Sequence, residues 1–131
     1  KGKTFYICKG FEPNILEYMK ASDLFCGKSG NMIAEPTFFG IPSIISGLST
    51  FIENDICDYY EKYVGCAIKE TNYKKACKLI ERFSKNEKDL EKYKIAAVNH
   101  HKDIGAELAA DFIYEKICEK FGDQYELPRH N

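Results

Sequence analysis

The stretch that most constrains the fold of this chain is residues 23–45, DLFCGKSGNMIAEPTFFGIPSII. It opens with a short apolar run at residues 24–26, and a polar turn with two glycines follows at residues 27–31. A helical segment over residues 32–39 then ends at a Gly-Ile-Pro stop, after which residues 43–45 predict a second buried strand. Strand, glycine turn, helix and strand form the repeating unit of parallel α/β sheets. The turn lies at the carboxyl end of the first strand, where such sheets bind ligands.

Further strands and helices are predicted on both sides of this unit. Residues 4–8 are β-branched and aromatic and predict a strand, and residues 65–68 predict another short one. Helices are predicted over residues 13–21, 52–63, 72–83, 86–101 and 105–121. Ser49 or Thr50 is a suitable N-cap for the second of these helices. Strands that alternate with helices predict an α/β fold: a parallel sheet of about four strands with flanking helices and a helical C-terminal part.

The length of the chain, 131 residues, fits one domain of modest size. We predict a single α/β domain over residues 1–121 and an irregular tail over residues 122–131, which contains Pro128 and shows no periodicity. The sequence begins with Lys1 rather than methionine, and its first predicted strand starts almost at once. We therefore expect an excised domain or a trimmed product, with edge strands missing upstream.

Charge and cysteine content limit the partners and the compartment. The net charge is −1, which argues against a nucleic-acid-binding surface. No apolar run approaches the ~20 residues that a membrane-spanning helix needs. The six cysteines form no C-x-x-C pair and are not clustered with histidines. They predict free thiols in a reducing cytoplasm rather than a disulfide framework or a metal site.

The glycine turn is the first candidate for a functional site. A helix N-terminus presents unpaired N–H groups and partial positive charge, Gly30 lets a ligand approach the backbone closely, and Lys28 adds a cation. These features suit a phosphate or diphosphate. Glu35, about one turn into the helix, can accept hydrogen bonds from two neighbouring hydroxyls, as on a ribose. The alternative from the residues alone is a plain strand-to-helix turn with a solvated glutamate.

Five short groups of residues, taken in order, resemble a known family. They are residues 10–12 (GFE), 21–24 (ASDL), 28–30 (KSG), 33–35 (IAE) and 40–42 (GIP). Together they resemble the C-terminal, nucleotide-sugar-binding domain of GT-B glycosyltransferases. The similar members are the monogalactosyldiacylglycerol synthases, the bacterial diacylglycerol glucosyltransferases and the peptidoglycan-precursor N-acetylglucosaminyltransferase. The resemblance covers residues 6–68, roughly half of the chain, and implies a partial, Rossmann-like domain.

The resemblance implies a UDP-sugar donor, no further cofactor and no obligatory metal. It also implies that the diphosphate contacts four residues of the turn: Ser29, Gly30, Asn31 and Met32. Glu35 would bind the ribose, and the backbone of Gly10 and Phe11 would lie beside the uracil. Glu53 and Asn54 are the nearest match to the family's region that holds donor-sugar hydroxyls. The alternative for these two is an ordinary helix N-terminus, where acidic side chains are favoured anyway.

The chain departs from the family in three ways. Met32 stands where the family often has threonine, and Glu35 follows the turn glycine one residue earlier than usual. The shorter spacing also resembles the UDP-N-acetylglucosamine 2-epimerases, but the tandem glutamates of those enzymes are absent at residues 34–36 (AEP). The family's upstream strand-helix section and its acceptor-binding N-terminal domain are missing. The general base usually comes from that domain, so no catalytic residue is assigned in this chain.

The expected function is donor binding in a glycosyltransferase that transfers a sugar to a lipid-linked or cell-surface glycan acceptor. The expected partners are the sugar donor, an N-terminal acceptor-binding domain or separate subunit, and a membrane face that is touched peripherally from the cytoplasm. We expect the fragment alone to be inactive. Two alternatives stay open: an epimerase-like enzyme domain, and a non-catalytic interaction domain that keeps the fold.

Overall fold

The computed structural model describes residues 10–100 and 105–122 of the chain. It divides the chain into two compact units, Lys1–His100 and His101–Asn131. The predicted strand at residues 4–8 and the predicted tail beyond Gly122 lie outside the described residues.

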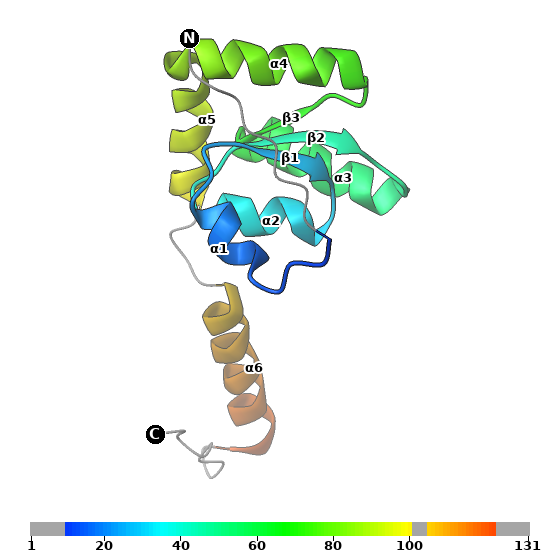
Figure 1. The fold of residues 1–131 in the computed structure, drawn as a ribbon. Helices are drawn as coiled ribbons and strands as arrows, with labels where there is room; N and C mark the ends of the chain where they lie inside the picture. The colour runs from blue at the N-terminus through cyan, green and yellow to red at the C-terminus, as the bar shows by residue number, and fades with distance from the viewer. Residues whose placement is uncertain (1–9, 101–104, 123–131) are drawn as a thin grey trace. The chain divides into compact units, whose positions relative to one another are not determined.

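Three parallel strands form the sheet of the first unit (Figure 1). They are β1 (Phe25–Lys28), β2 (Ser43–Gly47) and β3 (Ala67–Lys69), in the spatial order β1-β2-β3. Phe25 is paired with Ser43 and Ser43 with Ala67, and the β1–β2 register shifts between Gly27 and Lys28. The prediction of an α/β fold with a parallel sheet is confirmed, with three strands among the described residues.

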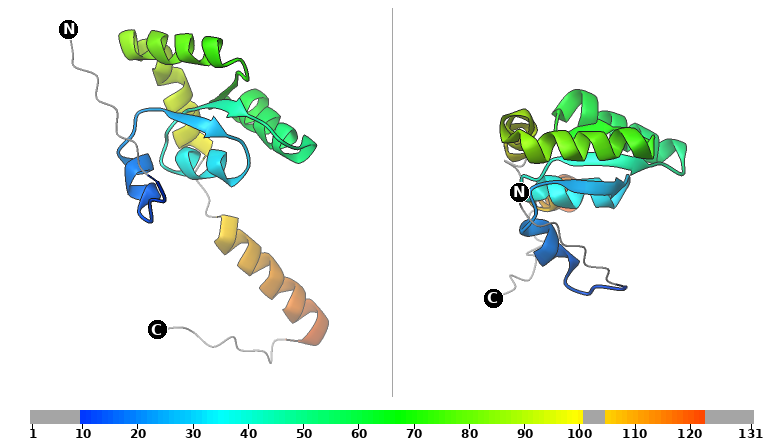
Figure 2. Two further views of the ribbon diagram at one scale, coloured as in Figure 1. Left: turned by 45° about the vertical axis from the view of Figure 1, so that its right-hand side comes forward. Right: turned by 45° about the horizontal axis from the view of Figure 1, so that its top comes forward.

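One face of the sheet is covered by α2 (Asn31–Phe38) and α3 (Phe51–Tyr59). Four buried residues form the core on this face: Ile33, Ile45, Cys57 and Ala67. The short helix α1 (Ile15–Lys20) lies against α2. Figures 1 and 2 show α1 and α2 on one side of the sheet and the later helix α4 on the other.

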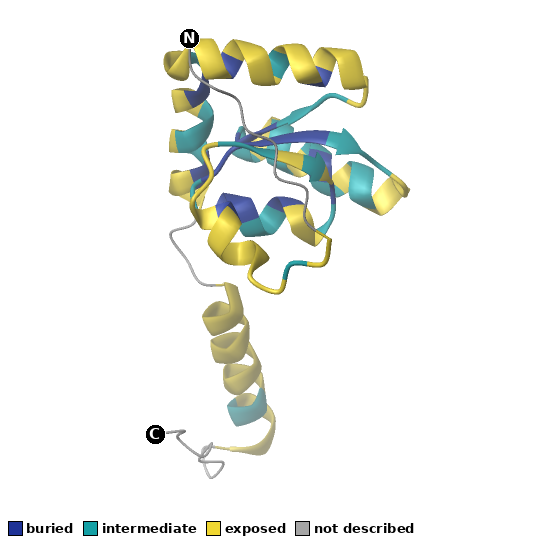
Figure 3. Cartoon of the chain, viewed as in Figure 1, coloured by how far each residue is buried: buried dark blue, intermediate teal, exposed yellow. Residues whose placement is uncertain are grey.

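The opposite face of the sheet is covered by α4 (Tyr73–Lys85), and α5 (Glu87–His100) contributes Leu90 to the same core before it runs along the side of the sheet to contact α2 and η1 (Tyr60–Val64). Its core residues are Ile44, Ala76, Phe83 and Leu90. Ile44 and Ile45 are neighbours in β2, and both are fully buried, because successive strand side chains point to opposite faces. Figure 3 shows the buried residues gathered in the central strand and on the inner faces of the helices. The central strand β2 therefore contributes one isoleucine to the core on each face of the sheet.

The strands β1 and β3 differ from the prediction at their ends. Gly27 and Lys28 were expected in the polar turn, but both belong to β1, so the turn is reduced to Ser29 and Gly30. The ring of Phe25 covers Gly27, where an added Cβ would lie 2.5 Å from the Phe25 Cζ. The strand expected at residues 65–68 begins two residues later, at Ala67.

The helix predicted over residues 52–63 is α3 followed by a single π-helical turn, η1 (Tyr60–Val64). Gly65 ends it with a φ of +79°, in the left-handed region that glycine favours. Thr50 is confirmed as the N-cap of α3, because its hydroxyl oxygen accepts a hydrogen bond from the Glu53 N–H at 3.2 Å. The Ser49 N–H in turn donates a 2.6 Å hydrogen bond to the Glu53 carboxylate. Two reciprocal hydrogen bonds therefore stabilise the start of α3.

The second unit contains one described helix, α6 (Gly105–Phe121), as predicted. Several of its apolar side chains are exposed, among them Leu108, Phe112 and Ile113. Among the helices of residues 10–100 and 105–122, none is both long enough and apolar enough to cross a membrane.

We predict that Ile45→Ala lowers the free energy of unfolding by about 2–5 kcal/mol, because it opens a cavity in the central strand, where Ile45 has no exposed surface. Ile95→Ala removes the same atoms from a side chain that is 53% exposed and should cost less than about 1 kcal/mol. Urea unfolding followed by circular dichroism measures both. Equal losses in the two variants would contradict the assignment of Ile45 to the core.

Candidate functional site

Two turns lie side by side at the carboxyl edge of the sheet. One leads from β1 through Ser29 and Gly30 into α2, and the other leads from β2 into α3. Because β1 and β2 are parallel neighbours, both turns leave the sheet at the same edge. The structure thereby brings together two groups of predicted site residues, Ser29 to Met32 and Glu53 with Asn54.

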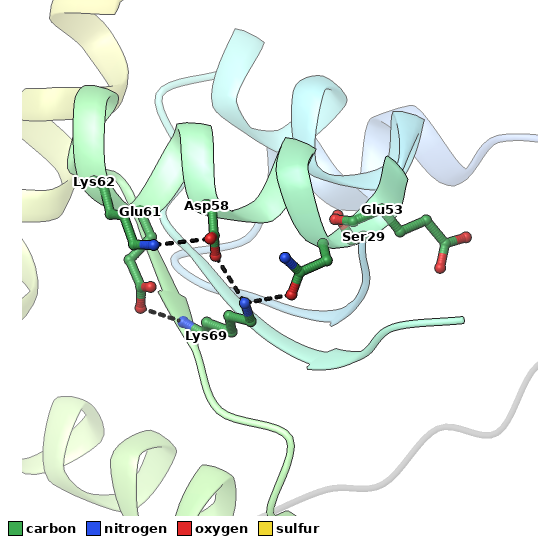
Figure 4. Close-up of polar contacts among 7 residues, drawn as sticks. Ser29, Glu53, Asp58, Glu61, Lys62 and Lys69 are labelled. Atoms are coloured by element: carbon green, nitrogen blue, oxygen red, sulfur yellow. Dashed lines mark hydrogen bonds and ion pairs between the residues drawn. The ribbon is translucent and has the colours of Figure 1, made fainter. Parts of the chain in front are cut away.

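Ser29 holds the two turns together. Its side chain is buried, and its hydroxyl donates a 2.7 Å hydrogen bond to the backbone carbonyl of Glu53. Its N–H donates a 3.1 Å hydrogen bond to the carbonyl of Gly47. Figure 4 shows Ser29 next to Glu53 on α3. Both donors of Ser29 are therefore used inside the protein, and the hydroxyl that was expected to face a ligand points into the fold.

Gly30 starts α2 in a conformation that favours glycine, with φ at +98° and ψ at −146°. A Cβ placed on it would meet no atom within 4 Å, so the surrounding space is open. No side chain in the described part of the chain caps α2, and Asn31 and Met32 at its start are exposed. The first N–H groups of a helix have no partner inside the helix and carry partial positive charge. This end of α2 can therefore accept an anion at its backbone.

Glu35 lies on α2, about one turn beyond Gly30. Its side chain is half-buried, and its carboxylate makes no hydrogen bond or ion pair with any residue in the described part of the chain. An ionised carboxylate has about four acceptor sites, which here are open to hydroxyl groups of a ligand.

Lys28 and Glu53 form an ion pair across the two turns, with 2.8 Å between the Lys28 Nζ and the Glu53 Oε1. The hydrogen bond from Lys28, followed by the one from the Ser49 N–H, holds the pKa of the Glu53 carboxyl below its ordinary value of 4.5. The cation that the sequence placed beside the glycine turn is thus held by Glu53. Lys28 and Glu53 are 25 positions apart, so no local sequence pattern predicts that they pair.

Asn54 belongs to a polar network that the sequence did not indicate. Figure 4 shows Lys69, Asp58, Glu61 and Lys62 of this network. The ammonium of Lys69, at the end of β3, donates to the Asn54 Oδ1 and, at 2.7 Å, to the Asp58 Oδ1. The Lys69 N–H donates to the Glu61 Oε1 at 2.7 Å. Hydrogen bonds from Lys62 and then Lys69 lower the pKa of Asp58 from its ordinary value. The network fastens α3 and η1 to β3 and fixes the side of Asn54 that carries its carbonyl oxygen.

Gly10 and Phe11, which were expected beside the uracil, are the first described residues. Phe11 is 96% exposed, and a Cβ on Gly10 would meet nothing within 4 Å. The structure leaves both exposed to solvent. Within the described residues no three histidine, cysteine or acidic side chains gather into a possible metal site.

Known proteins give no further assignment of this site. No family model matches the chain, and comparisons with curated proteins and with solved structures found no match either. The assignment therefore depends on the geometry at the carboxyl edge.

We predict that Ser29→Ala destabilises the fold by about 1–3 kcal/mol, because the Glu53 carbonyl loses a partly buried hydrogen bond from a side chain that is itself buried. Ser84→Ala is the matched control, since the Ser84 hydroxyl also donates to a glutamate carbonyl, that of Glu81, but at an exposed position. The control should change stability by less than about 0.5 kcal/mol. Chemical denaturation measures the free energy of unfolding of both variants. If Ser29→Ala leaves that free energy unchanged, the Ser29–Glu53 hydrogen bond does not stabilise the two turns.

We further predict that Lys28→Met raises the pKa of Glu53 toward its ordinary value of 4.5. In the unmodified chain the lowered pKa contributes stability that is fully present above the unfolded value and is lost as the pH falls through the folded value. The variant should lose less stability over that acid range. Carbon-13 NMR titration of the Glu53 carboxyl measures the pKa directly. An unchanged pKa in the variant would show that the ion pair does not form in solution.

Proposed function

We propose that this chain is the UDP-sugar-binding, C-terminal part of a GT-B glycosyltransferase that transfers a sugar to a lipid-linked or cell-surface glycan acceptor. The observation that carries the proposal is the start of α2. It begins at Gly30, in open space, at the carboxyl end of a parallel strand. Among the described residues no side chain caps it, and Glu35, whose carboxylate has no partner among them either, lies one turn beyond. Sheets of this type bind ligands at this edge.

The diphosphate binds at the backbone of the turn. The N–H groups of Gly30, Asn31 and Met32 provide the donors, and the partial positive charge of the helix terminus favours an anion. Ser29 acts as a positioning residue, because its two donors hold the turn on β2 and α3. Fixed backbone donors require no metal to bind two phosphates.

The ribose binds at Glu35. A carboxylate can accept one hydrogen bond from each of two neighbouring hydroxyls, and Glu35 has no competing protein partner within the described residues. The uracil lies beside the backbone of Gly10 and Phe11, whose exposure leaves them open to a ligand.

The donor sugar binds at Glu53 and Asn54. Each oxygen of the Glu53 carboxylate holds one protein donor, Lys28 on Oε1 and the Ser49 N–H on Oε2, so acceptor capacity remains for sugar hydroxyls. Lys69 occupies the carbonyl oxygen of Asn54, which leaves the amide nitrogen as a donor. These two residues begin α3 and border the turn at Ser29.

In the complete enzyme an acceptor hydroxyl attacks the anomeric carbon of the donor sugar, the bond from that carbon to the diphosphate breaks, and UDP leaves. Negative charge develops on the leaving diphosphate, where the start of α2 stabilises it. The acceptor site and the general base come from an N-terminal domain or a separate subunit, so the chain alone is inactive. The acceptor class implies peripheral contact with the cytoplasmic face of a membrane.

The test is the affinity for UDP, measured by calorimetry on this chain and on Glu35→Gln. We expect the variant to bind UDP about ten- to a hundredfold more weakly, because a charge-assisted set of hydrogen bonds is lost. Glu17→Gln changes an exposed glutamate on α1 and should leave the affinity unaltered.

Two results would overturn the proposal. One is the absence of UDP binding at millimolar concentration, both in this chain and in a version with upstream residues restored. The other is UDP binding that Glu35→Gln leaves unchanged. Turnover of UDP-N-acetylglucosamine by the longer version without any acceptor would identify an epimerase instead.

A further inference from the structure

Helix α4 carries an excess of positive charge on the side that faces away from the sheet. Its 13 residues include five cationic side chains and a single carboxylate, Glu81, whereas the net charge of the whole chain is −1. Ala76 and Phe83 are buried toward the sheet, and all five cations are exposed (Figure 3). These five side chains define the basic face of α4: Lys74, Lys75, Lys78, Arg82 and Lys85.

Two of the five cations are held by carboxylates. Arg82 pairs with Asp89 on α5 at 3.2 Å, and Lys85 pairs with Glu81 at 2.5 Å, one turn before it on the same helix. The cations that form no ion pair within the described part of the chain are Lys74, Lys75 and Lys78. The first half of the basic face therefore carries positive charge that no described side chain neutralises.

The first turn of α4 has the opposite charge to the one that stabilises a helix start. Acidic side chains are favoured there, and α3, α5 and α6 each have one. In α3, Glu53 stands three residues after the cap, Thr50, and completes a reciprocal pair of hydrogen bonds. In α4 the cap is Asn72, and Lys75 occupies the corresponding position, directly after Lys74. Departures of this kind from local preference are expected at functional sites.

The chemistry of the basic face matches an anionic bilayer. Protein interfaces are depleted of lysine and enriched in aromatic residues and arginine. Single-stranded nucleic acids are bound in grooves that contain stacking aromatic side chains. Within the first unit α4 is the outermost element on its side of the sheet, so the basic face is the convex side of a helix (Figures 1 and 2). Clusters of four to eight lysines and arginines on an amphipathic helix are attracted by the negative surface potential of anionic lipids.

We propose that the basic face of α4 binds the surface of a bilayer that contains anionic phospholipids. The contact is electrostatic, because the apolar side of α4 is used in the core of the domain, at Ala76 and Phe83. The inference rests on the proposed function for the purpose of this contact, since the acceptor there is lipid-linked. Binding to vesicles is measured without nucleotide, so failure of this inference and failure of UDP binding are distinguishable.

The test is co-sedimentation of the whole chain with vesicles of phosphatidylcholine, with and without phosphatidylserine. We expect binding only where phosphatidylserine is present. Raising the salt concentration from about 0.1 M to about 1 M should abolish binding, because the screening length falls from about 10 Å to about 3 Å. Each lysine near an anionic surface contributes about fivefold to the affinity. Glutamine at positions 74, 75 and 78 should therefore weaken binding about a hundredfold, and it preserves the helix because its propensity is close to that of lysine.

A matched control removes the same charge from exposed positions outside α4. It combines Lys20→Gln on α1 with Lys116→Gln and Lys120→Gln on α6. Because these side chains do not belong to the basic face, the control should change the affinity for phosphatidylserine vesicles far less than the triple variant of α4. Circular dichroism of both variants shows that the fold is kept.

Lys75→Glu distinguishes a role in binding from a role in the fold. A glutamate at this position can complete the reciprocal cap with Asn72 and complements the partial positive charge of the helix start. The midpoint of urea unfolding should therefore rise. Binding to phosphatidylserine vesicles should fall at least about tenfold, because the charge is reversed. Greater stability together with weaker binding is the result expected of a lysine that acts in binding.

Five results would overturn the proposal. They are the absence of binding to phosphatidylserine vesicles at low salt, equal binding to phosphatidylcholine alone, equal losses in the triple variant and its control, and unchanged binding by Lys75→Glu. The fifth is tighter binding to duplex DNA than to vesicles at the same phosphate concentration, which would identify a nucleic acid as the partner.

Discussion

The hydrogen bond from the Ser29 hydroxyl to the Glu53 carbonyl is the contact on which the carboxyl edge of this fold depends. It joins two turns that leave neighbouring parallel strands, and the Ser29 N–H bond to Gly47 secures the same place from the backbone. Both donors of Ser29 are used inside the fold, and the next residue, Gly30, begins α2 with no side-chain cap from the described residues. The start of α2 is therefore positioned by a residue whose own donors are bonded to β2 and α3.

Charge at this edge is arranged in pairs that order the loops. Lys28 on β1 reaches Glu53 on α3, and Lys69 on β3 reaches Asp58 and Asn54 on the same helix. Exposed ion pairs contribute little to stability by themselves. Their effect here is geometric, because each lysine at the end of a strand fixes one side of α3. The start of α2 is left as the place where partial positive charge meets no side-chain partner within the described residues.

Sequence predicted the features that depend on local chemistry. The helical segment at residues 32–39 predicted α2, and a hydroxyl at Ser49 or Thr50 was predicted to cap α3, where the structure shows Thr50. The end of β1 could not be predicted in the same way, because Gly27 and Lys28 have the composition of a turn and become strand through pairing with β2. The lysine partners of Glu53 and Asn54 could not be predicted from the sequence either. Their lysines lie 25 and 15 positions away in sequence, where no periodicity connects them.

The two glycines of the turn satisfy different constraints, and the difference bears on function. Gly27 is required by packing, since the Phe25 ring lies where its Cβ would be. Gly30 is required by its backbone dihedrals alone, because a Cβ there would meet open space. The start of α2 therefore depends on the conformation that glycine permits and not on close packing at Gly30. Within the described part of the fold no side chain caps these donors, and the partial positive charge of the helix start favours an anion there.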